Sequence, residues 1–417
     1  MKRQKVVVLM VFFLGTISAL VAYGKASASQ FRQWRQTIVR TLFVPAPLPP
    51  LSPDRHGSFA PAKGVIADKV TYGTEFGMRV PAVVYHPEKE KEKLPGMIVV
   101  NGHGGDKYSW YSFYTGILYA RAGAVVLTYD PIGEGERNPE RKSGTRLHDR
   151  IVNAPNYPQK LSGFMITDVM QAVSYLRTRP DVDPSRIAVL GYSMGSFVSA
   201  LAGAVDPRIK VLVLSGGGDL DGPGGYWENS GKPMCQSVPW KSLSVLGDKA
   251  AVVYALNQLR GPTFIMNGTK DTVVDIPGKH EQPFFDDLAH RTEAITGTRK
   301  NIFETYFIPD ASHRPNWVTR RAALWLQSKL HFPNWTAKTI MAMPETHISE
   351  WAAKNHVDMD RAYLSEDKEG GIMALGSDVP NVPRTQLNVF TDQEFQKQKS
   401  RLVYQAWTAN VLAAASE

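Results

Sequence analysis

The chain has 417 residues, 43% hydrophobic and 21% charged, a composition that excludes disordered, collagen-like and coiled-coil proteins. Its formal net charge is +9, but residues 1–28 hold four of the 48 basic residues and no acidic one. The remainder has no dense Lys/Arg stripe, so we expect no nucleic-acid partner. The single cysteine, Cys235, excludes an internal disulfide and any zinc site built from several thiolates.

The N-terminal segment predicts export. Lys2, Arg3 and Lys5 precede an uncharged run from Val6 to Gly24, and Ala26-Ser27-Ala28 supplies small residues for a signal peptidase. This pattern is typical of a signal peptide (residues 1–28) cleaved after Ala28, which would place the protein in the periplasm or outside the cell. An uncleaved anchor is the alternative, because the uncharged run nearly spans a bilayer, and only then would we expect membrane contact.

Behind this segment, residues 29–69 are expected to form a short helix and a proline-rich connector. Phe31, Trp34, Ile38 and Leu42 recur at helical spacing, and five prolines between residues 45 and 53 prevent the helix from continuing. No large domain fits into so short a stretch.

Residues 70–330 show short β-rich runs that alternate with helical ones. We expect strands at Lys69–Thr74, Met78–His86, Met97–Val100, Ala124–Tyr129, Arg186–Leu190, Lys210–Leu214, Thr263–Met266 and Ile302–Ile308, and helices at Leu161–Leu176, Met194–Ala204, Lys249–Leu259 and Trp317–Leu330. Such alternation predicts an α/β fold with a mostly parallel central sheet covered by helices on both faces. Several strands are continuous apolar runs, as strands buried on both faces should be.

Residues 331–417 lack this alternation and are expected to form a mostly helical extension packed on the core. Thr391 and Glu394 form a capping box that predicts a helix running towards Ala414.

A nucleophile elbow is predicted at residues 191–195, which read Gly-Tyr-Ser-Met-Gly between a buried strand and a helix of small residues. In that context Ser193 lies on a strained turn with its hydroxyl at the carboxyl edge of the sheet. The N-terminus of the following helix favours developing negative charge there.

A serine hydroxyl needs a histidine base that is oriented by a carboxylate, and both should follow Ser193 in the chain. Asp271 follows the strand Thr263–Met266, and His313 follows the strand Ile302–Ile308. We expect these two residues to complete a Ser-His-Asp triad. Asp275 and Asp310 are the competing carboxylates.

The oxyanion produced by serine attack requires two backbone N–H donors. Met194 should supply one, because it directly follows the nucleophile. The loop after Met97–Val100 should supply the other through Gly104 or Gly105, and its His103 should hold the loop by hydrogen bonds rather than act as a base.

Together these motifs resemble the α/β-hydrolase superfamily. The segment Asp130–Arg137 further resembles secreted bacterial esterases of the acetyl-xylan-esterase-like and dienelactone-hydrolase-like groups. The resemblance covers about residues 70–330. It implies hydrolysis of carboxylic esters without a cofactor or metal, on a small-molecule or carbohydrate ester. Dienelactone hydrolases proper carry cysteine where this chain has Ser193, which disfavours that activity. Asp130 and Arg137 are expected to pin their loop structurally.

Substrate contacts are expected from the insertion Gly216–Leu259, whose Tyr226, Trp227 and Trp240 could stack on a sugar or line an acyl pocket, and from His103 and Tyr192 beside the elbow. The insertion is too short for a large helical cap, which favours short acyl groups such as acetyl.

Two other functions compete with an esterase. A prolyl-oligopeptidase-like peptidase would need a large β-propeller, for which residues 29–69 are too short. A binding protein on an inactive hydrolase fold would be expected to lack a triad member, and none is missing here.

Overall fold

The computed structural model describes residues 25–414 except residues 91, 151, 222–226, 228–234, 280, 358 and 360–370. Most of the expected signal segment, residues 1–24, and the expected substrate contact Tyr226 therefore lie outside the described residues. Among the described helices, none combines the length and apolar character needed to cross a bilayer.

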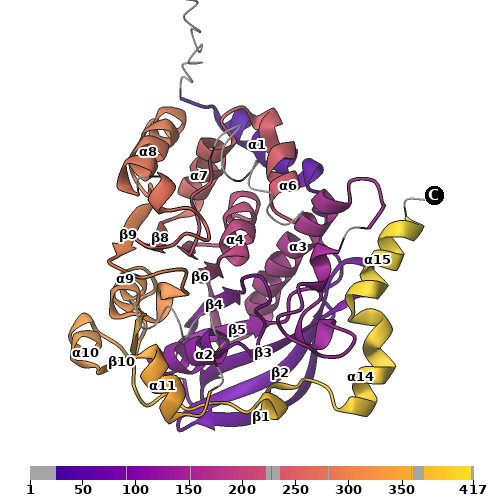
Figure 1. The fold of residues 1–417 in the computed structure, drawn as a ribbon, viewed down its shortest axis with the longest axis vertical. Coiled ribbons are helices and arrows are strands. Elements are labelled where there is room, and N and C mark those ends of the chain that lie inside the picture. The colour runs from indigo at the N-terminus through magenta and orange to yellow at the C-terminus, as the bar shows by residue number, and fades with distance from the viewer. Residues whose placement is uncertain are drawn as a thin grey trace, which may run out of the picture.

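A nine-stranded sheet forms the centre of the molecule (Figure 1). Its order is β1-β2-β3-β5-β4-β6-β7-β8-β9, with β1, β2, β3 and β5 paired antiparallel and the strands from β5 to β9 paired parallel. The strands are β1 Asp54–Ala62, β2 Val65–Gly73, β3 Arg79–Pro87, β4 Leu94–Val100, β5 Val125–Tyr129, β6 Val182–Tyr192, β7 Val211–Ser215, β8 Thr263–Gly268 and β9 Glu304–Ile308. The predicted α/β architecture is confirmed.

Helices cover both faces of this sheet. Along β6, Ile187 and Val189 belong to one hydrophobic cluster and Ala188 and Leu190 to the other, as strand alternation requires. The first cluster includes residues of α1 Ala28–Thr41, α3 Tyr157–Thr178, α4 Met194–Val205, α6 Ser237–Ser242, α7 Lys249–Arg260 and α8 Gln282–Thr296. The second includes residues of α2 Trp110–Ala122 and α9 Arg320–Leu330.

Among the elements that escaped prediction, β1 and α2 have sequences that carry no clear period. The strand β1 lies in the stretch expected to be a connector; it is an edge strand with no buried residue, so it shows no alternating apolar face. Helix α2 is buried all around except at Arg121, so it has no amphipathic stripe.

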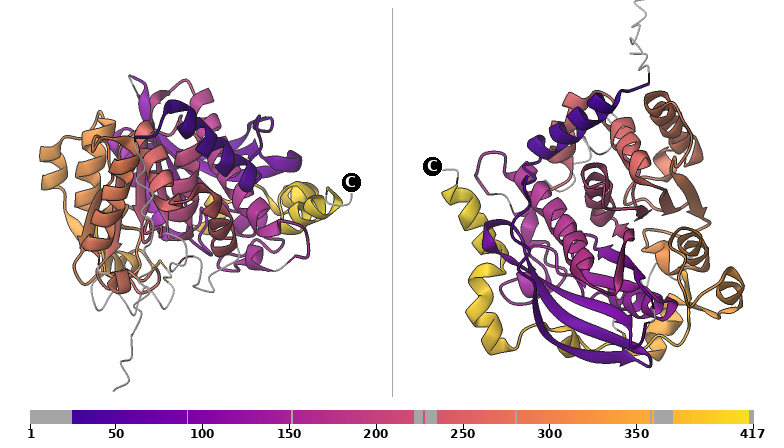
Figure 2. Two further views of the ribbon diagram at one scale, coloured as in Figure 1. Left: turned by 90° about the horizontal axis from the view of Figure 1, so that it is seen from above. Right: turned by 180° about the vertical axis from the view of Figure 1, so that it is seen from behind.

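The C-terminal extension packs against the domain, and the single helix expected at its end is broken. Its elements are α10 Ala337–Ala342, β10 Glu345–His347, α11 Ile348–Lys354, β11 Met373–Leu375, α13 Arg384–Leu387, α14 Asp392–Gln398 and α15 Tyr404–Ala413. The expected capping box at Thr391 opens α14, but the turn Lys399–Arg401 separates it from α15. Figures 1 and 2 show the extension leaving α9 on one side of the molecule and ending with α14 and α15 on the other.

Candidate active site

Ser193 occupies the strained turn between β6 and α4 that the sequence predicts. Its backbone has φ 54° and ψ −118°, outside the conformations that a non-glycine residue prefers. A side chain at Gly191 would overlap the backbone of Gly195, and one at Gly195 would overlap the carbonyl of Val100. Gly191 therefore lets the end of β6 approach the start of α4, and Gly195 lets α4 approach the end of β4. The N–H of Ser193 donates to the carbonyl of Ser215 at 2.9 Å, which fixes the turn on β7.

The structure brings Asp271 and His313 together from the ends of two neighbouring strands. Nδ1 of His313 lies 2.8 Å from Oδ2 of Asp271. The other carboxylate oxygen, Oδ1, accepts the N–H groups of Val273 and Val274 at 3.1 and 3.3 Å. Asp271 is fully buried, while the side chain of His313 is 11% exposed. A buried carboxylate held in this way can orient one ring nitrogen and leave the other for chemistry.

The competing carboxylates lie elsewhere. Asp310 is exposed and pairs with Lys270 at 3.1 Å on the surface. Asp275 lies in the turn after Asp271, where its backbone carbonyl accepts the N–H of Lys279. Asp271 is accordingly the carboxylate that contacts His313.

Neighbouring residues position His313 beside the elbow. Tyr192, the residue before Ser193, packs its ring 5.0 Å from the imidazole and donates from its hydroxyl to the carbonyl of His313 at 3.1 Å. Gly216, which follows β7, has φ +58°, and a Cβ there would lie 2.9 Å from Cε1 of His313. From the sequence we expected Tyr192 to contact substrate; in the structure its side chain is buried and holds the histidine loop.

The loop after β4 approaches the nucleophile through Gly102 rather than through the two predicted glycines. A Cβ on Gly102 would lie 3.0 Å from Cβ of Ser193. The N–H of Gly105 is already donated to the carbonyl of Gly102 at 3.1 Å, and the carbonyl of Gly104 accepts the N–H of Gly144 at 3.0 Å. In this conformation the turn takes up the N–H of Gly105, so this donor is not free for an oxyanion.

Met194, the other expected donor, is the first residue of α4 and therefore lies at the helix N-terminus.

His103, which we expected to hold its loop rather than act as a base, contacts two side chains from other segments. Its Nε2 lies 3.1 Å from Sγ of Cys235 and its ring stacks on His148 at 5.3 Å. Burial raises the pKa of the Cys235 thiol well above its ordinary value, and proximity to Asp149 adds to this effect.

The insertion after β7 contributes core residues instead of exposed rings. Trp227 stacks on Phe197 at 5.8 Å and donates to the carbonyl of Asp219, while Trp240 is fully buried and packs edge-on against Phe197. The protein core covers both indoles, so neither offers an exposed face on which a sugar could stack.

A buried charge network supports the loop after β5, as its resemblance implied, but with different partners. Asp130 pairs with Lys107 and also accepts the N–H of Glu136 at 2.8 Å, whereas Arg137 pairs with Asp168 on α3. Burial raises the pKa of Asp130 to about 6, although the Lys107 cation opposes this shift.

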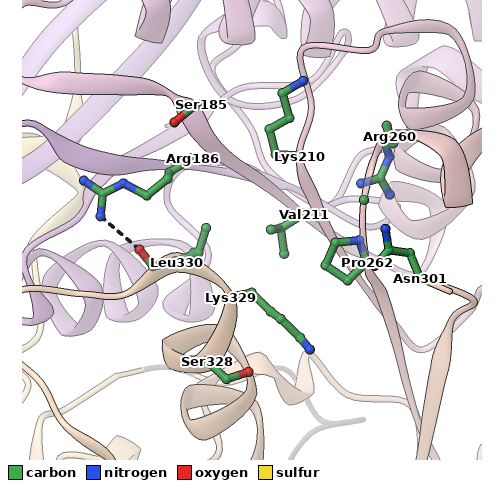
Figure 3. Close-up of a pocket in the computed structure, with 11 residues that line it drawn as sticks. Ser185, Arg186, Lys210, Val211, Arg260, Pro262, Asn301, Ser328, Lys329 and Leu330 are labelled. Atoms are coloured by element: carbon green, nitrogen blue, oxygen red, sulfur yellow. Dashed lines mark hydrogen bonds between the residues drawn. The ribbon is translucent and has the colours of Figure 1, made fainter.

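A surface pocket of about 350 Å³ lies near the starts of the parallel strands, whereas the candidate active site follows their ends (Figure 3). Arg186, Val211 and Pro262 line it near the starts of β6, β7 and β8, while Ser193, Asp271 and His313 follow the ends of strands. This pocket therefore does not belong to the candidate active site.

Comparisons with known proteins agree with this fold. Residues 57–215 match the family model for acetyl xylan esterase (AXE1), a segment that includes Ser193 but neither Asp271 nor His313. A thiohydrolase, apmlB of Arthrinium phaeospermum, is 29% identical over 155 residues, which are 36% of this chain and 42% of the relative. The chain thus spans less than half the length of that curated relative.

Two solved structures share the fold. The methylesterase BT1017 superimposes with a TM-score of 0.58 at 18% identity, covering 93% of this chain and 75% of that one. Acetyl xylan esterase 1 from Thermoanaerobacterium sp. JW/SL YS485 gives a TM-score of 0.51 at 16% identity, with 76% and 96% covered. The chain is therefore similar to the AXE1 family over residues 57–215, and it shares the α/β fold of these two esterase structures.

Proposed function

We propose that this protein is a serine carboxylic-ester hydrolase in which Ser193 is the nucleophile, His313 the general base and Asp271 the orienting carboxylate. The observation that carries the proposal is the 2.8 Å contact between His313 and a fully buried Asp271. This pair lies beside a serine held at φ 54° at a helix N-terminus.

In this mechanism His313 takes the proton of the Ser193 hydroxyl as its oxygen attacks the ester carbonyl. The C–O bond to the alcohol breaks as His313 returns the proton to the leaving oxygen. A water molecule, deprotonated by the same imidazole, then attacks the acyl-serine and releases the acid. Asp271 stays ionised throughout and stabilises the imidazolium.

The transition-state oxyanion would accept the N–H of Met194 and a second N–H from the loop at Gly102. The helix dipole of α4 adds to this stabilisation because its N-terminus faces the same point. Removing one such donor typically costs about 10²–10³ in kcat.

We propose short-acyl esters, acetyl above all, as substrates, with acetylated polysaccharide as the natural class. The description of the matching family model supports acetyl groups on a sugar polymer. The described part of the insertion after β7 supports a small acyl site as well, since Trp227 and Trp240 fill the core.

We also propose that the protein is exported, with cleavage after Ala28. The support is the basic and apolar pattern of the N-terminus. In the folded chain Ser27 caps α1 by accepting the N–H of Gln30 at 3.2 Å, so the mature protein would begin at Ser29 without that cap. N-terminal sequencing of the exported protein tests this, and a membrane-bound product that starts at Met1 would establish the anchor instead.

The substrate proposal is tested by kcat/KM for p-nitrophenyl acetate, butyrate and octanoate, with acetate release from acetylated xylan and a peptide p-nitroanilide in parallel. Because each added methylene changes selectivity by about 1–3 kcal/mol in a small pocket, acetate should exceed butyrate by about tenfold or more. A maximum at octanoate would refute the short-acyl proposal. Preferential cleavage of the amide would indicate a peptidase.

A further inference from the structure

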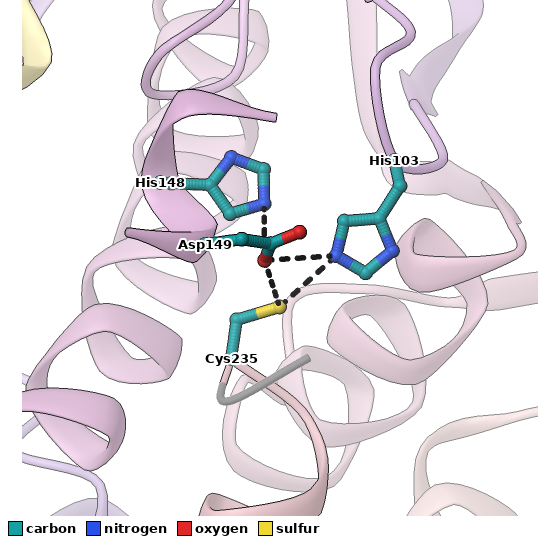
Figure 4. Close-up of side chains that lie close together, drawn as sticks. All are labelled: His103, His148, Asp149 and Cys235. Carbon is teal, nitrogen blue, oxygen red and sulfur yellow. Dashed lines mark hydrogen bonds and ion pairs between the residues drawn. The ribbon is translucent and has the colours of Figure 1, made fainter. Parts of the chain in front are cut away.

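Four side chains that can bind metal ions meet next to the candidate active site (Figure 4). His103 comes from the loop after β4, His148 and Asp149 from the turn Leu147–Asp149, and Cys235 from the start of the segment leading to α6. One ligand atom from each lies within 4.8 Å of those of the other three. From the sequence, with its single cysteine, we expected no metal. The four residues lie far apart in the chain and match no spacing motif.

We propose that His103, His148, Asp149 and Cys235 form a binding site for one divalent cation, with zinc as the preferred ion. Zinc takes nitrogen, oxygen and sulfur ligands at about 2.0–2.3 Å in a tetrahedron, which separates the ligand atoms by roughly 3.3–3.7 Å. The distances from Nε2 of His103 to Sγ of Cys235 and to Oδ1 of Asp149 are 3.1 and 3.6 Å. From the same Oδ1, Nε2 of His148 lies at 3.6 Å and Sγ of Cys235 at 3.7 Å.

The surroundings of His148 suit a metal ligand. Its Nδ1 lies 3.2 Å from the carbonyl of Ile132, a contact in which Nδ1 carries the proton and Nε2 keeps its lone pair. Nε2 is buried and has no hydrogen-bond partner among the described residues. A buried ring nitrogen without a partner is costly, and a cation between the four side chains would satisfy it.

The charges of the four ligands also match zinc. Two neutral imidazoles, one carboxylate and one thiolate balance a divalent cation, so the occupied site would be electrically neutral. His148 and Cys235 are buried, and a neutral complex avoids the cost of leaving an unpaired charge there. Because a mixed set of sulfur, nitrogen and oxygen ligands is typical of zinc, calcium and magnesium are disfavoured.

A second nucleophilic triad is the other reading of these residues, and the geometry contradicts it. In a triad the carboxylate holds one ring nitrogen and the nucleophile contacts the other. Here Asp149 and Cys235 both approach Nε2 of His103, so the atoms converge on one point instead of forming a chain.

Four protein ligands would fill a tetrahedral ion, which is characteristic of structural zinc. The ion would join three loops that lie far apart in sequence. One of them carries Gly102, whose backbone passes Ser193, so the metal would hold the loop that forms the oxyanion side of the active site.

The proposal is tested on the purified full-length protein after chelator treatment and dialysis. One equivalent of Zn²⁺ should bind and raise the melting temperature, since binding to the native state alone is stabilising. Co²⁺ in place of zinc should give the absorption bands of a tetrahedral ion and a thiolate-to-metal charge-transfer band. That band reports Cys235 specifically, because the chain has no other cysteine.

Variants distinguish metal binding at this site from metal binding at other histidines. Cys235→Ser should abolish the charge-transfer band, and Asp149→Asn should weaken zinc binding by about tenfold or more. The band should be unchanged in His290→Ala, which removes an exposed histidine, and in Ser193→Ala. Circular dichroism establishes that each variant is folded. Absence of stoichiometric Zn²⁺ binding in the parent protein, or Co²⁺ binding without the thiolate band, would overturn the proposal.

Discussion

Glu136 connects the core of the hydrolase domain to the C-terminal extension, and Glu136→Gln tests how much stability that connection provides. Its Oε2 lies 2.9 Å from Nζ of Lys107 and accepts the N–H of Val389 at 2.9 Å, while Oε1 accepts the N–H of Phe390 at 3.0 Å. The side chains of Glu136 and Lys107 are both fully buried. Glutamine keeps the volume but carries no charge and has only one acceptor oxygen.

The expected cost follows from these contacts. Breaking a buried ion pair by removing one partner costs about 3–5 kcal/mol. Lys107 keeps its contact with Asp130, which favours the lower end of that range. The N–H of Val389 or that of Phe390 would also face the NH₂ group of the new glutamine and would lose its acceptor oxygen. We therefore expect the free energy of unfolding to fall by about 3 kcal/mol, a large part of the 5–15 kcal/mol typical of a domain.

Urea unfolding measures the loss, and limited proteolysis shows whether the extension has loosened. Glu140→Gln is the matched control, because Glu140 is exposed and pairs only at the surface with Lys142 among the described residues. The control should unfold like the parent. A change below about 0.5 kcal/mol in Glu136→Gln, the range of ordinary surface substitutions, with unaltered cleavage of residues 384–414, would refute this reasoning.

Three further predictions concern single residues. Burial raises the pKa of Glu75 to about 8, so the folded state keeps a proton that the unfolded state loses, and stability falls as the pH rises from about 4.5 to 8. Glu75→Gln should hence leave the melting temperature unchanged at pH 4.5 and raise it at pH 8.5; an equal effect at both pH values would contradict this. Gly216→Ala should lower kcat by about tenfold to a hundredfold with a smaller change in KM, because the added Cβ displaces His313; an unchanged kcat would be inconsistent with the contact. Asp271→Asn should reduce kcat by about 10⁴, whereas Asp275→Asn should have little effect, and the reverse order would reassign the carboxylate.

Much of the fold was predictable because hydrophobic periodicity and chain order are local signals. The strands β4, β5, β7 and β8 are short and largely apolar, and β6 ends in such a run. The elbow glycines mark the turn between β6 and α4. The contact between Asp271 and His313 was predictable for the same reason, since both residues follow strands whose carboxyl ends share one edge of the sheet.

What could not be predicted depends on contacts between distant segments. Tryptophans in a glycine-rich insertion are typical of a binding surface. Trp227 and Trp240 are core residues instead, because both pack against Phe197 of α4. The loop after β4 contains three glycines, and only the folded chain shows that Gly102 is the one that packs against Ser193.

The metal-binding cluster is the extreme case. Cys235 is 132 residues from His103 in the chain, and no spacing rule joins them. A lone cysteine argues against a zinc site made of thiolates, but it leaves open a mixed site that only the folded chain brings together.

The central claim is that Ser193 is the nucleophile, and active-site labelling followed by peptide mass spectrometry tests it most directly. A fluorophosphonate should form one covalent adduct on the peptide that contains Ser193. The adduct should be absent in Ser193→Ala and form much more slowly in His313→Ala, with both variants folded as judged by circular dichroism. An adduct on any other residue, or undiminished labelling of Ser193→Ala, would contradict the account.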